Sequence, residues 1–431
     1  MFGYYIDLAV RSLLRNKVLT ALMVLTLGLG IGASMTTLTV QRLLSGDPVP
    51  EKSERLFHPR INPRPREGYA PGQVTFAFTY IDVMNLLHEH EAERQAPVAI
   101  SPVKVVLPGS TNAPFFGNAV LTTTDFFTMF DVPFEYGGGW SAPDDDGGSN
   151  VIVIADALNE KWFGGADSVG QSVRINDRDF RIVGVLKPWS PQPRFYGVDL
   201  DGRAYGDGES LFLPLQSGLA AQMGTPDINC WSNVDQDKLK IAPCIWLSYW
   251  VQLADADSVV RYKNYLDNYA RAQMRQGRFY RDETALPNLR QFLHDVGVVP
   301  DTVKLKTGLS FGFLLICVVN TVGLLLAKCL RRSSEIGIRR ALGATRGAIF
   351  AQFMIEAAII GVAGGLLGLC FAELGLWGIR HQPSDYASLA YLNAHMFLMN
   401  FIVALSASLI AGLLPAWRAS DVAPAIQVKA G

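Results

Sequence analysis

The stretch Thr307–Ala327, TGLSFGFLLICVVNTVGLLLA, contains no Asp, Glu, Lys or Arg and is followed directly by Lys328. A helix needs about 20 mostly apolar residues to cross the hydrocarbon core of a bilayer, so this stretch has the composition and length of a transmembrane span. Three further apolar runs have a similar length, namely Val18–Gln41, Ala348–Ala372 and Met396–Trp417. The sequence therefore predicts a membrane protein with four transmembrane α-helices.

The composition of the whole chain agrees with this prediction. Of the 431 residues, 49% are hydrophobic and 18% are charged, which is more apolar than an ordinary soluble protein. The formal net charge of -1 argues against a nucleic-acid partner, because proteins that bind nucleic acids concentrate Lys and Arg. The run Val18–Gln41 is longer than the apolar core of a secretory signal peptide, so we expect it to stay in the protein as an anchor.

Basic residues set the expected orientation. The connection between the second and third spans carries Lys328, Arg331, Arg332, Arg339, Arg340 and Arg346, whereas the connection between the third and fourth carries only Arg380. Arg11, Arg15 and Lys17 precede the first span, and Arg418 follows the last. Because Lys and Arg near spans are held on the cytoplasmic side, we expect a multi-pass protein of the cell inner membrane with both termini cytoplasmic and the large insert periplasmic.

The predicted organisation assigns every part of the chain. It consists of an amphipathic cytoplasmic segment (1–17), a first transmembrane helix (18–42), a periplasmic domain (43–305), a second helix (306–330), a cytoplasmic connection (331–347), a third helix (348–373), a short periplasmic loop (374–395), a fourth helix (396–417) and a cytoplasmic tail (418–431).

The insert between the first two spans is predicted to be a mixed α/β domain. Its short β-branched runs are separated by Gly, Pro and Asp, as is typical of strands and turns. Val151–Ile154 reads as a buried strand, followed by a short helix with Asp156 as its N-cap. Ser172–Ile175 and Phe180–Val185 are expected to form a hairpin, and Asp144–Ser149 is expected to be a loop.

Two cysteines of the insert, Cys230 and Cys244, flank a polar stretch on the side predicted to be periplasmic, where disulfides persist. A disulfide that closes a loop of about 15 residues could stabilise the domain by roughly 3 kcal/mol on the chain-entropy model. The alternative is two free thiols in a loop.

Small residues occur in the first and third spans. They are Gly28, Gly30, Gly32, Ala33, Gly361, Gly364, Gly365 and Gly368. Small residues let helix backbones approach closely, either between two copies of the chain or among the four helices of one copy. The sequence leaves both alternatives open.

Motifs for catalysis, metal binding or nucleotide binding do not point to a site. Gly165–Ser172 resembles a phosphate-binding loop, but it has Gln171 in place of the lysine, and it is expected to follow a helix and precede a strand, the reverse of the required context. His88 and His90 are near neighbours on an expected helix, where residues two apart face away from each other. We therefore expect no catalytic residues, no metal and no cofactor bound by this chain.

Glu356 is the carboxylate inside the third apolar run. A charge within a membrane span is a candidate functional residue. It lies near the expected cytoplasmic end of the span, however, where pairing with Arg346 or with headgroup-level groups would give it a structural role. We favour the structural interpretation.

The connection Arg331–Arg346, RRSSEIGIRRALGATR, combines charged and apolar residues. Ser333 or Ser334 could cap a short helix that ends at Gly343 and forms a compact knob for a protein partner. Anchoring to the cytoplasmic side alone would not require Ile336, Ile338 and Leu342 between the charges.

This connection resembles a known family. Glu335–Ala344 and Gln352–Glu356 are similar to the cytoplasmic loop and third helix of the MacB/FtsX family of ABC transporter permeases. Further likeness to the family's periplasmic domain and C-terminal tail occurs at Thr123–Phe127, Val151–Ile154, Phe163–Gly165, Phe180–Val185, Pro415–Ala419 and Pro424. The resemblance therefore extends over nearly the whole chain.

The resemblance implies a non-catalytic permease subunit that dimerises with a second copy or a paralogue and works with ABC ATPase subunits. ATP and Mg²⁺ would be used by the ATPase, which is expected from another gene product because this chain starts almost directly at the first span, whereas MacB carries a fused ATPase domain. The segment that would sit on the ATPase is Glu335, Ile336, Gly337, Ile338, Arg339, Arg340, Ala341, Leu342 and Gly343.

Two functions compete under this resemblance. The first is efflux or export of a substrate from the periplasm, with a periplasmic adaptor and a TolC-like outer-membrane channel as further partners. The second is an FtsX-like mechanical signalling subunit that activates a periplasmic partner and transports nothing. The large insert favours the first. A membrane-bound enzyme ranks last, because no catalytic motif is present.

Overall fold

The chain folds into two compact units, here called the helical unit and the insert domain. The computed structural model describes residues 2–66, 74–107, 114–225, 228–231, 238–382 and 386–421. The helical unit comprises Met1–Ser45 and Val299–Gly431, and the insert domain comprises Gly46–Val298. In the described part of the chain, four helices are long and apolar enough to cross a membrane. The predicted fold class, transmembrane helices with a mixed α/β insert between the first and second, is confirmed.

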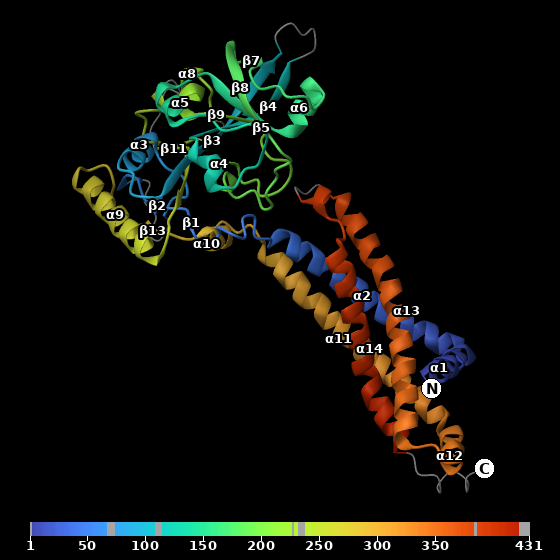
Figure 1. Cartoon of the computed structure of the whole chain (residues 1–431). Coiled ribbons are helices and arrows are strands. Elements are labelled where there is room, and N and C mark those ends of the chain that lie inside the picture. Colours follow the sequence, from blue (N-terminus) through green and yellow to red (C-terminus); the bar gives the residue numbers. More distant parts are fainter. Residues whose placement is uncertain are drawn as a thin grey trace. The chain divides into compact units, whose positions relative to one another are not determined.

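The helical unit is built from the two ends of the chain (Figure 1). Its elements are α1 (Phe2–Arg15), α2 (Lys17–Leu44), α11 (Asp301–Arg331), α12 (Ser333–Ala341), α13 (Arg346–Arg380), the short 3-10 helix η3 (Ala387–Leu389) and α14 (Ala394–Ser420). The long helices extend past the predicted spans at both ends. The apolar run sets the part that fits the hydrocarbon core, whereas the hydrogen-bonded helix continues until a cap or a turn ends it. The tail after Asp421 lies outside the described residues.

Local signals set two of the helix starts. The Thr345 hydroxyl accepts a hydrogen bond from the amide of Ala348 (3.2 Å) and caps α13. Asn393 caps α14 in the same way, with its side-chain oxygen 2.9 Å from the amide of Met396. Both caps satisfy amides that have no partner within the helix.

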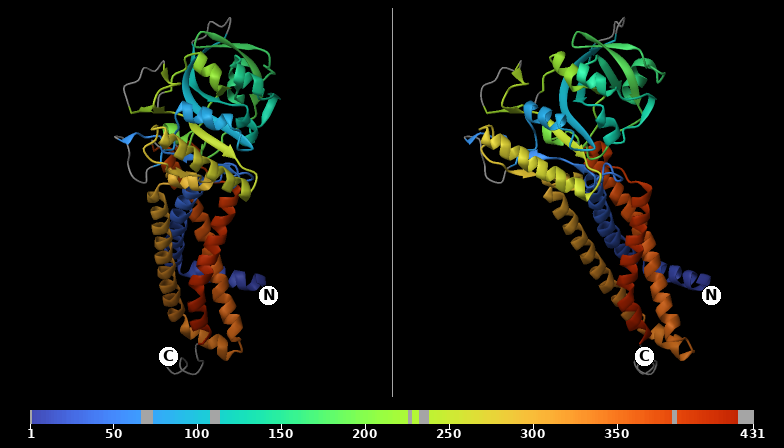
Figure 2. Two further views of the ribbon diagram at one scale, coloured as in Figure 1. Left: turned by 90° about the vertical axis from the view of Figure 1, so that its left-hand side faces the viewer. Right: turned by 60° about the vertical axis from the view of Figure 1, so that its left-hand side comes forward.

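Small residues pack the four long helices against one another. α13 lies along α2 and α14 (Figures 1 and 2). α11 also lies along α2 and α14. A Cβ added at Gly361 of α13 would lie 2.0 Å from the hydroxyl oxygen of Ser408 in α14. A Cβ at Gly32 of α2 would lie 2.5 Å from the Cβ of Phe371 in α13. Of the two alternatives for the small residues, the structure shows packing among helices of one chain.

Buried polar groups also join these helices. The Asn400 amide of α14 donates to the carbonyl oxygen of Gly365 in α13 (3.0 Å), and the Ser34 hydroxyl of α2 donates to the carbonyl of Ser310 in α11 (3.0 Å). Such hydrogen bonds between helices add specificity where the surroundings are apolar.

The described part of the insert domain has a mixed α/β arrangement. Its helices are α3 (Tyr80–His88), α4 (Asp125–Met129), α5 (Ala142–Gly147), α6 (Asp156–Phe163), α7 (Val198–Asp201), α8 (Leu215–Ala220), α9 (Ala256–Arg275) and α10 (Leu289–Asp295). Its strands are β1 (Leu56–Phe57), β2 (Arg60–Ile61), β3 (Arg94–Val106), β4 (Phe115–Thr122), β5 (Phe134–Gly137), β6 (Val151–Ile154), β7 (Ser172–Ile175), β8 (Arg178–Leu186), β9 (Leu211–Pro214), β10 (Asn229–Cys230), β11 (Cys244–Ile245), β12 (Ser248–Gln252) and β13 (Thr284–Ala285).

The main sheet of the insert domain closes on itself. Strand pairing runs from β3 to β4, β9, β6, β8 and β7, and β7 pairs again with β3. β4 with β9 and β6 with β8 are parallel, and the other pairs of this ring are antiparallel. β12 and β1 extend the sheet beyond β3, and β5 pairs with β8. Closure removes the unpaired strand edges that would otherwise be exposed.

Three local predictions in the insert are corrected by the structure. Asp144–Gly147 is helical rather than a loop, because Ser141 and Asp144 form a capping box that starts α5, while Gly148 and Ser149 follow the helix. Asp156 is the first helical residue rather than the N-cap of α6, because Ala155 keeps an extended backbone and its amide bonds to the carbonyl of Ser210. The predicted hairpin is confirmed, but its second strand begins at Arg178 rather than Phe180, because the chain turns over only two residues, Asn176 and Asp177, both with positive φ.

Candidate functional site

The connection between α11 and α13 folds as the short helix α12. Arg332 precedes the helix without a side-chain cap, so neither Ser333 nor Ser334 caps it as expected. The helix ends at Ala341, and Gly343 follows with φ of 100°, a backbone conformation that glycine adopts at low cost. The predicted helix is confirmed, but it ends two residues before the predicted end at Gly343.

One side of α12 is held against the helical unit. Ile336 is buried in a cluster with Cys329, Ile349, Phe353, Ala416 and Ala419, which come from α11, α13 and α14. Arg339 adds polar contacts, because its guanidinium donates to the carboxylate of Glu335 (2.7 Å) and to the side-chain carbonyl of Gln352 (3.2 Å). Helix α12 is therefore seated on three long helices rather than held by its two ends alone.

The other side of α12 presents apolar side chains to the surroundings. Ile338 is 57% exposed and Leu342 is 83% exposed. Exposed aliphatic residues on a well-seated element are typical of surfaces that bind another protein. The residues predicted to couple to a partner thus divide into three groups. Ile336 and Gly337 are buried and seat the helix, whereas Ile338, Ala341, Leu342 and Gly343 are exposed. The other three, Glu335, Arg339 and Arg340, are half-buried.

A buried ionic network lies at the end of α11 that leads into α12. The ammonium of Lys328 donates to Glu356 of α13 (2.7 Å), and both side chains are almost fully buried, at 1% and 0% exposure. A guanidinium nitrogen of Arg332 lies 3.6 Å from the other carboxylate oxygen of Glu356. Arg332 also donates to the hydroxyl and the carbonyl oxygen of Ser12 in α1. One carboxylate therefore joins α11 to α13, and Arg332 extends the connection to α1.

The expected pairing of Glu356 with Arg346 is wrong. Arg346 instead forms an ion pair with Asp421 (3.3 Å), which links the start of α13 to the end of α14. The reason is geometric, because Glu356 faces α11 from the inside of the helical unit and is buried, while the Arg346 side chain is 67% exposed. In the sequence, Lys328 and Arg332 served only to predict the orientation of the spans. Their position directly after an apolar run was the one sign that they could pair with a carboxylate inside the helical unit.

The other sequence candidates lie in the insert domain. Cys230 and Cys244 form a disulfide that joins β10 to β11. His88 ends α3, and His90 follows the helix with a positive φ, so the two are not on one helix. Within the described ranges, no group of three or more His, Cys, Asp or Glu is placed to hold a metal ion.

Two family models match the sequence. One is described as a MacB-like periplasmic core domain and matches residues 20–269. The other is described as an FtsX-like permease C-terminal region and matches residues 307–424. The first match begins inside α2 and ends inside α9. The second begins inside α11 and includes α13 and α14.

Individual proteins show the same likeness. A pyoverdine export ATP-binding/permease protein, PvdT of Pseudomonas aeruginosa, is 26% identical over 304 residues, which cover 70% of this chain and 40% of PvdT. A macrolide export ATP-binding/permease protein, MacB of Azoarcus sp., is 24% identical over 308 residues, which cover 71% of this chain and 41% of that protein. The chain thus spans about two fifths of the length of these relatives.

Among solved structures, the periplasmic region of MacB from Actinobacillus actinomycetemcomitans matches with a TM-score of 0.38 and 15% sequence identity. The match covers 59% of this chain and 97% of that one.

Proposed function

Because the chain belongs to the MacB/FtsX family of ABC transporter permeases, we propose that it is the membrane subunit that converts ATP hydrolysis by an ABC ATPase into motion of its insert domain. The observation that carries this proposal is α12, a short helix seated on three long helices that keeps Ile338 and Leu342 exposed. ATP and Mg²⁺ are used by the ATPase, and this chain supplies the docking surface. One matched family model is described as a MacB-like periplasmic core domain and the other as an FtsX-like permease C-terminal region.

The proposed topology places α12 in the cytoplasm. Lys328, Arg331 and Arg332 lie at the end of α11, and Arg339 and Arg340 lie in α12, so this end of the helical unit concentrates positive charge. Basic residues near spans are retained on the cytoplasmic side, which also places both termini there and the insert domain in the periplasm. The inner membrane is the compartment that fits this arrangement.

The coupling segment is Glu335–Gly343, and its residues have separate tasks. Ile338 and Leu342 contact the ATPase, while Ile336 and the hydrogen bond from Arg339 to Gln352 seat α12. A displacement of α12 is passed to α11 and α13 through the apolar cluster around Ile336, and to α1 through Arg332. Because α11 begins directly after the insert domain in the chain, movement of this helix is transmitted along one continuous element.

Export is the favoured use of this motion. The names of the matched relatives describe export of pyoverdine and of macrolides, and both are ATP-binding permeases. We infer that this chain serves efflux or export of a molecule from the periplasm, as a dimer with a second copy or a paralogue. A periplasmic adaptor and an outer-membrane channel are the further partners that such export requires.

A second candidate is mechanical signalling without transport. The FtsX-like model matches the whole region from α11 to α14, and the same stroke could activate a periplasmic partner. The two candidates differ in one measurement, which is ATP-dependent movement of a substrate by the reconstituted complex.

The decisive test is co-purification of the full chain with ABC ATPase subunits from the same organism. We expect the wild type to retain an ATPase and the Leu342→Asp variant to lose it, since a carboxylate at an exposed contact opposes burial in an interface. Phe116→Asp is the matched control, because Phe116 is 71% exposed in the insert domain, far from α12 in the sequence. The mass of the complex distinguishes two copies from a pair of paralogues. Equal retention by wild type and Leu342→Asp would refute docking through α12.

A further inference from the structure

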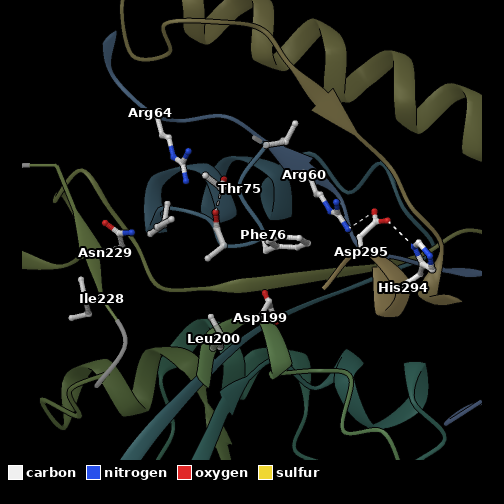
Figure 3. Close-up of a pocket in the computed structure, with 13 residues that line it drawn as sticks. Arg60, Arg64, Thr75, Phe76, Asp199, Leu200, Ile228, Asn229, His294 and Asp295 are labelled. Carbon is white, nitrogen blue, oxygen red and sulfur yellow. Dashed lines mark hydrogen bonds and ion pairs between the residues drawn. The ribbon is translucent and has the colours of Figure 1, made fainter. Parts of the chain in front are cut away.

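The insert domain contains an open cleft that the proposed coupling does not use. Its volume is about 1050 Å³, and all of its lining residues belong to the insert domain. Figure 3 shows the lining side chains converging from β2, from the segment before α3, from α7, from α10 and from the hairpin of β10 and β11. The apolar part of the wall comes from Val74, Phe76, Ala77, Leu200, Ile228 and Ile245. A concave surface with apolar walls and a few convergent polar groups is the usual form of a binding site.

Arg60 supplies a buried donor to this wall. Its side chain is 9% exposed and forms an ion pair with Asp295 (3.0 Å), and its guanidinium carbon lies 4.2 Å from the centre of the Phe76 ring. The Nε of Arg60 has no hydrogen-bond partner among the described residues. Burial lowers the pKa of Arg60. A desolvated donor of this kind is costly unless an acceptor reaches it.

Asp199 supplies a buried acceptor. Its side chain is fully buried, and one carboxylate oxygen lies 3.3 Å from Nε2 of His58, which is also 3.1 Å from the Ser248 hydroxyl. The other carboxylate oxygen of Asp199 has no hydrogen-bond partner in the described part of the chain. Burial lowers the pKa of His58, so the imidazole is neutral at pH 7 and does not cancel the carboxylate charge.

Further contacts hold two of the cleft's walls in place, namely α7 and the hairpin of β10 and β11. α7, which carries Asp199 and Leu200, is held by the buried Arg194, whose guanidinium pairs with Asp201 and with Glu209. On the hairpin side, the disulfide between Cys230 and Cys244 joins the two strands next to Asn229 and Ile245. The walls are therefore supported from behind, as a binding site requires.

The charges of the lining select the class of ligand. Arg60 and Arg64 are balanced by Asp199 and Asp295, so the cleft favours a molecule without net charge. An N–H donor on Arg60 and an oxygen acceptor on Asp199 together match a secondary amide, which offers one carbonyl and one N–H. The aliphatic and aromatic walls match apolar substituents on either side of that amide.

We propose that this cleft binds short apolar peptides through one peptide group. The peptide carbonyl accepts from Nε of Arg60, the peptide N–H donates to the carboxylate of Asp199, and the neighbouring side chains pack on Phe76 and Leu200. The ring of Phe76 covers the guanidinium and the carboxylate of Asp199 is fully buried. The peptide therefore reaches both groups when the half-buried side chains of Phe76 and Leu200 turn aside. The assignment goes beyond the proposed function and stands whether or not α12 docks on an ATPase, since binding is measured on this chain alone.

The test is isothermal titration of the purified full chain in detergent with N-acetyl-leucyl-phenylalanine amide. We expect saturable binding by the wild type, and none by Leu200→Trp, in which the larger ring fills the cleft from a partly exposed position of α7. Asp199→Asn should weaken binding about tenfold, and so should an ester analogue of the ligand that lacks the peptide N–H. Phe116→Ala, an exposed aromatic residue outside the cleft lining, should bind like the wild type.

The titrations distinguish peptide binding in this cleft from its absence. Saturable wild-type binding that Leu200→Trp abolishes and the ester analogue weakens supports the assignment. Absence of saturable binding up to millimolar peptide, binding unchanged by Leu200→Trp, or equal affinity for amide and ester overturns it. Thermal unfolding of each variant shows whether the fold is retained, and the ester comparison, which uses wild-type protein, keeps the proposal falsifiable if a variant fails to fold.

Discussion

At the scale of single residues, the buried Lys328–Glu356 pair connects two helices of the helical unit. Two charges that are almost fully buried lose their hydration, and the loss is tolerable because the ammonium and the carboxylate lie 2.7 Å apart. Arg332 adds a second cation at 3.6 Å and connects the network to Ser12 of α1. The network therefore joins α1, α11 and α13 next to the helix that is proposed to meet the ATPase.

Removing one partner of the Lys328–Glu356 pair should lower the free energy of unfolding more than removing both partners. Lys328→Met leaves Glu356 buried with Arg332 as its remaining partner, and we expect a loss of about 3 kcal/mol in unfolding free energy. Lys328→Met combined with Glu356→Leu should recover most of that loss, because no unpaired charge remains. The measurement is unfolding of the detergent-solubilised chain. Arg346→Met, which removes an exposed ion pair with Asp421, is the control and should cost less than about 1 kcal/mol.

Equal stability of the single and the double variant would show that the burial of Glu356 is not compensated by Lys328.

Asp145 gives the insert domain a pH-dependent stability. Burial raises the pKa of its carboxyl from 3.8 to about 6, although the carboxylate accepts hydrogen bonds from the amide of Thr124 and the indole of Trp140. A folded-state pKa above the unfolded value means that the folded chain binds the proton more tightly. The stabilising contribution of this group is complete below pH 3.8 and is lost as the pH rises to about 6.

The raised pKa of Asp145 predicts that the difference in melting temperature between wild type and Asp145→Asn changes with pH. Between pH 3.8 and about 6, the wild-type melting temperature should fall relative to that of the variant, and above that range the difference should be constant. The comparison of the two proteins across pH cancels the titration of groups that they share. A difference in melting temperature that stays constant through this range would contradict the raised pKa.

At the scale of elements, α13 makes the closest contacts of the helical unit. Its glycines face two neighbours, since Gly364 and Gly368 meet Leu27 and Ile31 of α2, while Gly361 meets α14. Close packing of this kind lets the long helix act as one body with its neighbours. α12 has a different character, because it is held by the buried Ile336 and by the hydrogen bond from Arg339 to Gln352, while Ile338 and Ala341 stay exposed.

Gly361→Ala should separate α13 from α14. The added Cβ would lie 2.0 Å from Oγ and 2.7 Å from Cβ of Ser408, so a helix must shift, at a cost of about 1–3 kcal/mol. Gly378→Ala is the matched control on the same helix, because a Cβ at that position meets nothing within 4 Å and alanine favours helix. Thermal unfolding in detergent measures both. If both variants keep wild-type stability, the two helices are not packed as closely as described.

At the scale of the whole molecule, the chain combines two units with different cores. The helical unit is held by small residues, apolar clusters, interhelical hydrogen bonds and ion pairs, whereas the insert domain has one large apolar core cluster to which strands and helices both contribute. The parts proposed for binding are separate in the sequence. α12 belongs to the helical unit, and the cleft belongs to the insert domain.

The proposed topology predicts that the two units are labelled from opposite sides of the membrane. Ser149→Cys in the insert domain should react with an impermeant maleimide added to whole cells with a permeable outer membrane. Ser334→Cys at α12 should react only after the inner membrane is opened. The exposed free cysteine, Cys370, is replaced by serine in both variants. Labelling of both positions from the same side would refute the topology.

The sequence by itself was sufficient to predict the membrane spans, the mixed α/β insert and the exposed connection that forms α12. These features depend on the length of apolar runs, on local periodicity and on motifs within a few residues, all of which can be read along the chain. The buried strand Val151–Ile154 and the hairpin after it were predicted for the same reason.

The tertiary structure decided which distant residues meet. Glu356 pairs with Lys328, 28 positions away, because the end of α11 packs on α13, and no local pattern distinguishes that partner from Arg346. The strand ring and the cleft depend likewise on segments far apart in the chain, such as Arg60 and Asp199. Such contacts follow from how whole elements pack, and packing is a property of the folded chain that a single sequence does not display.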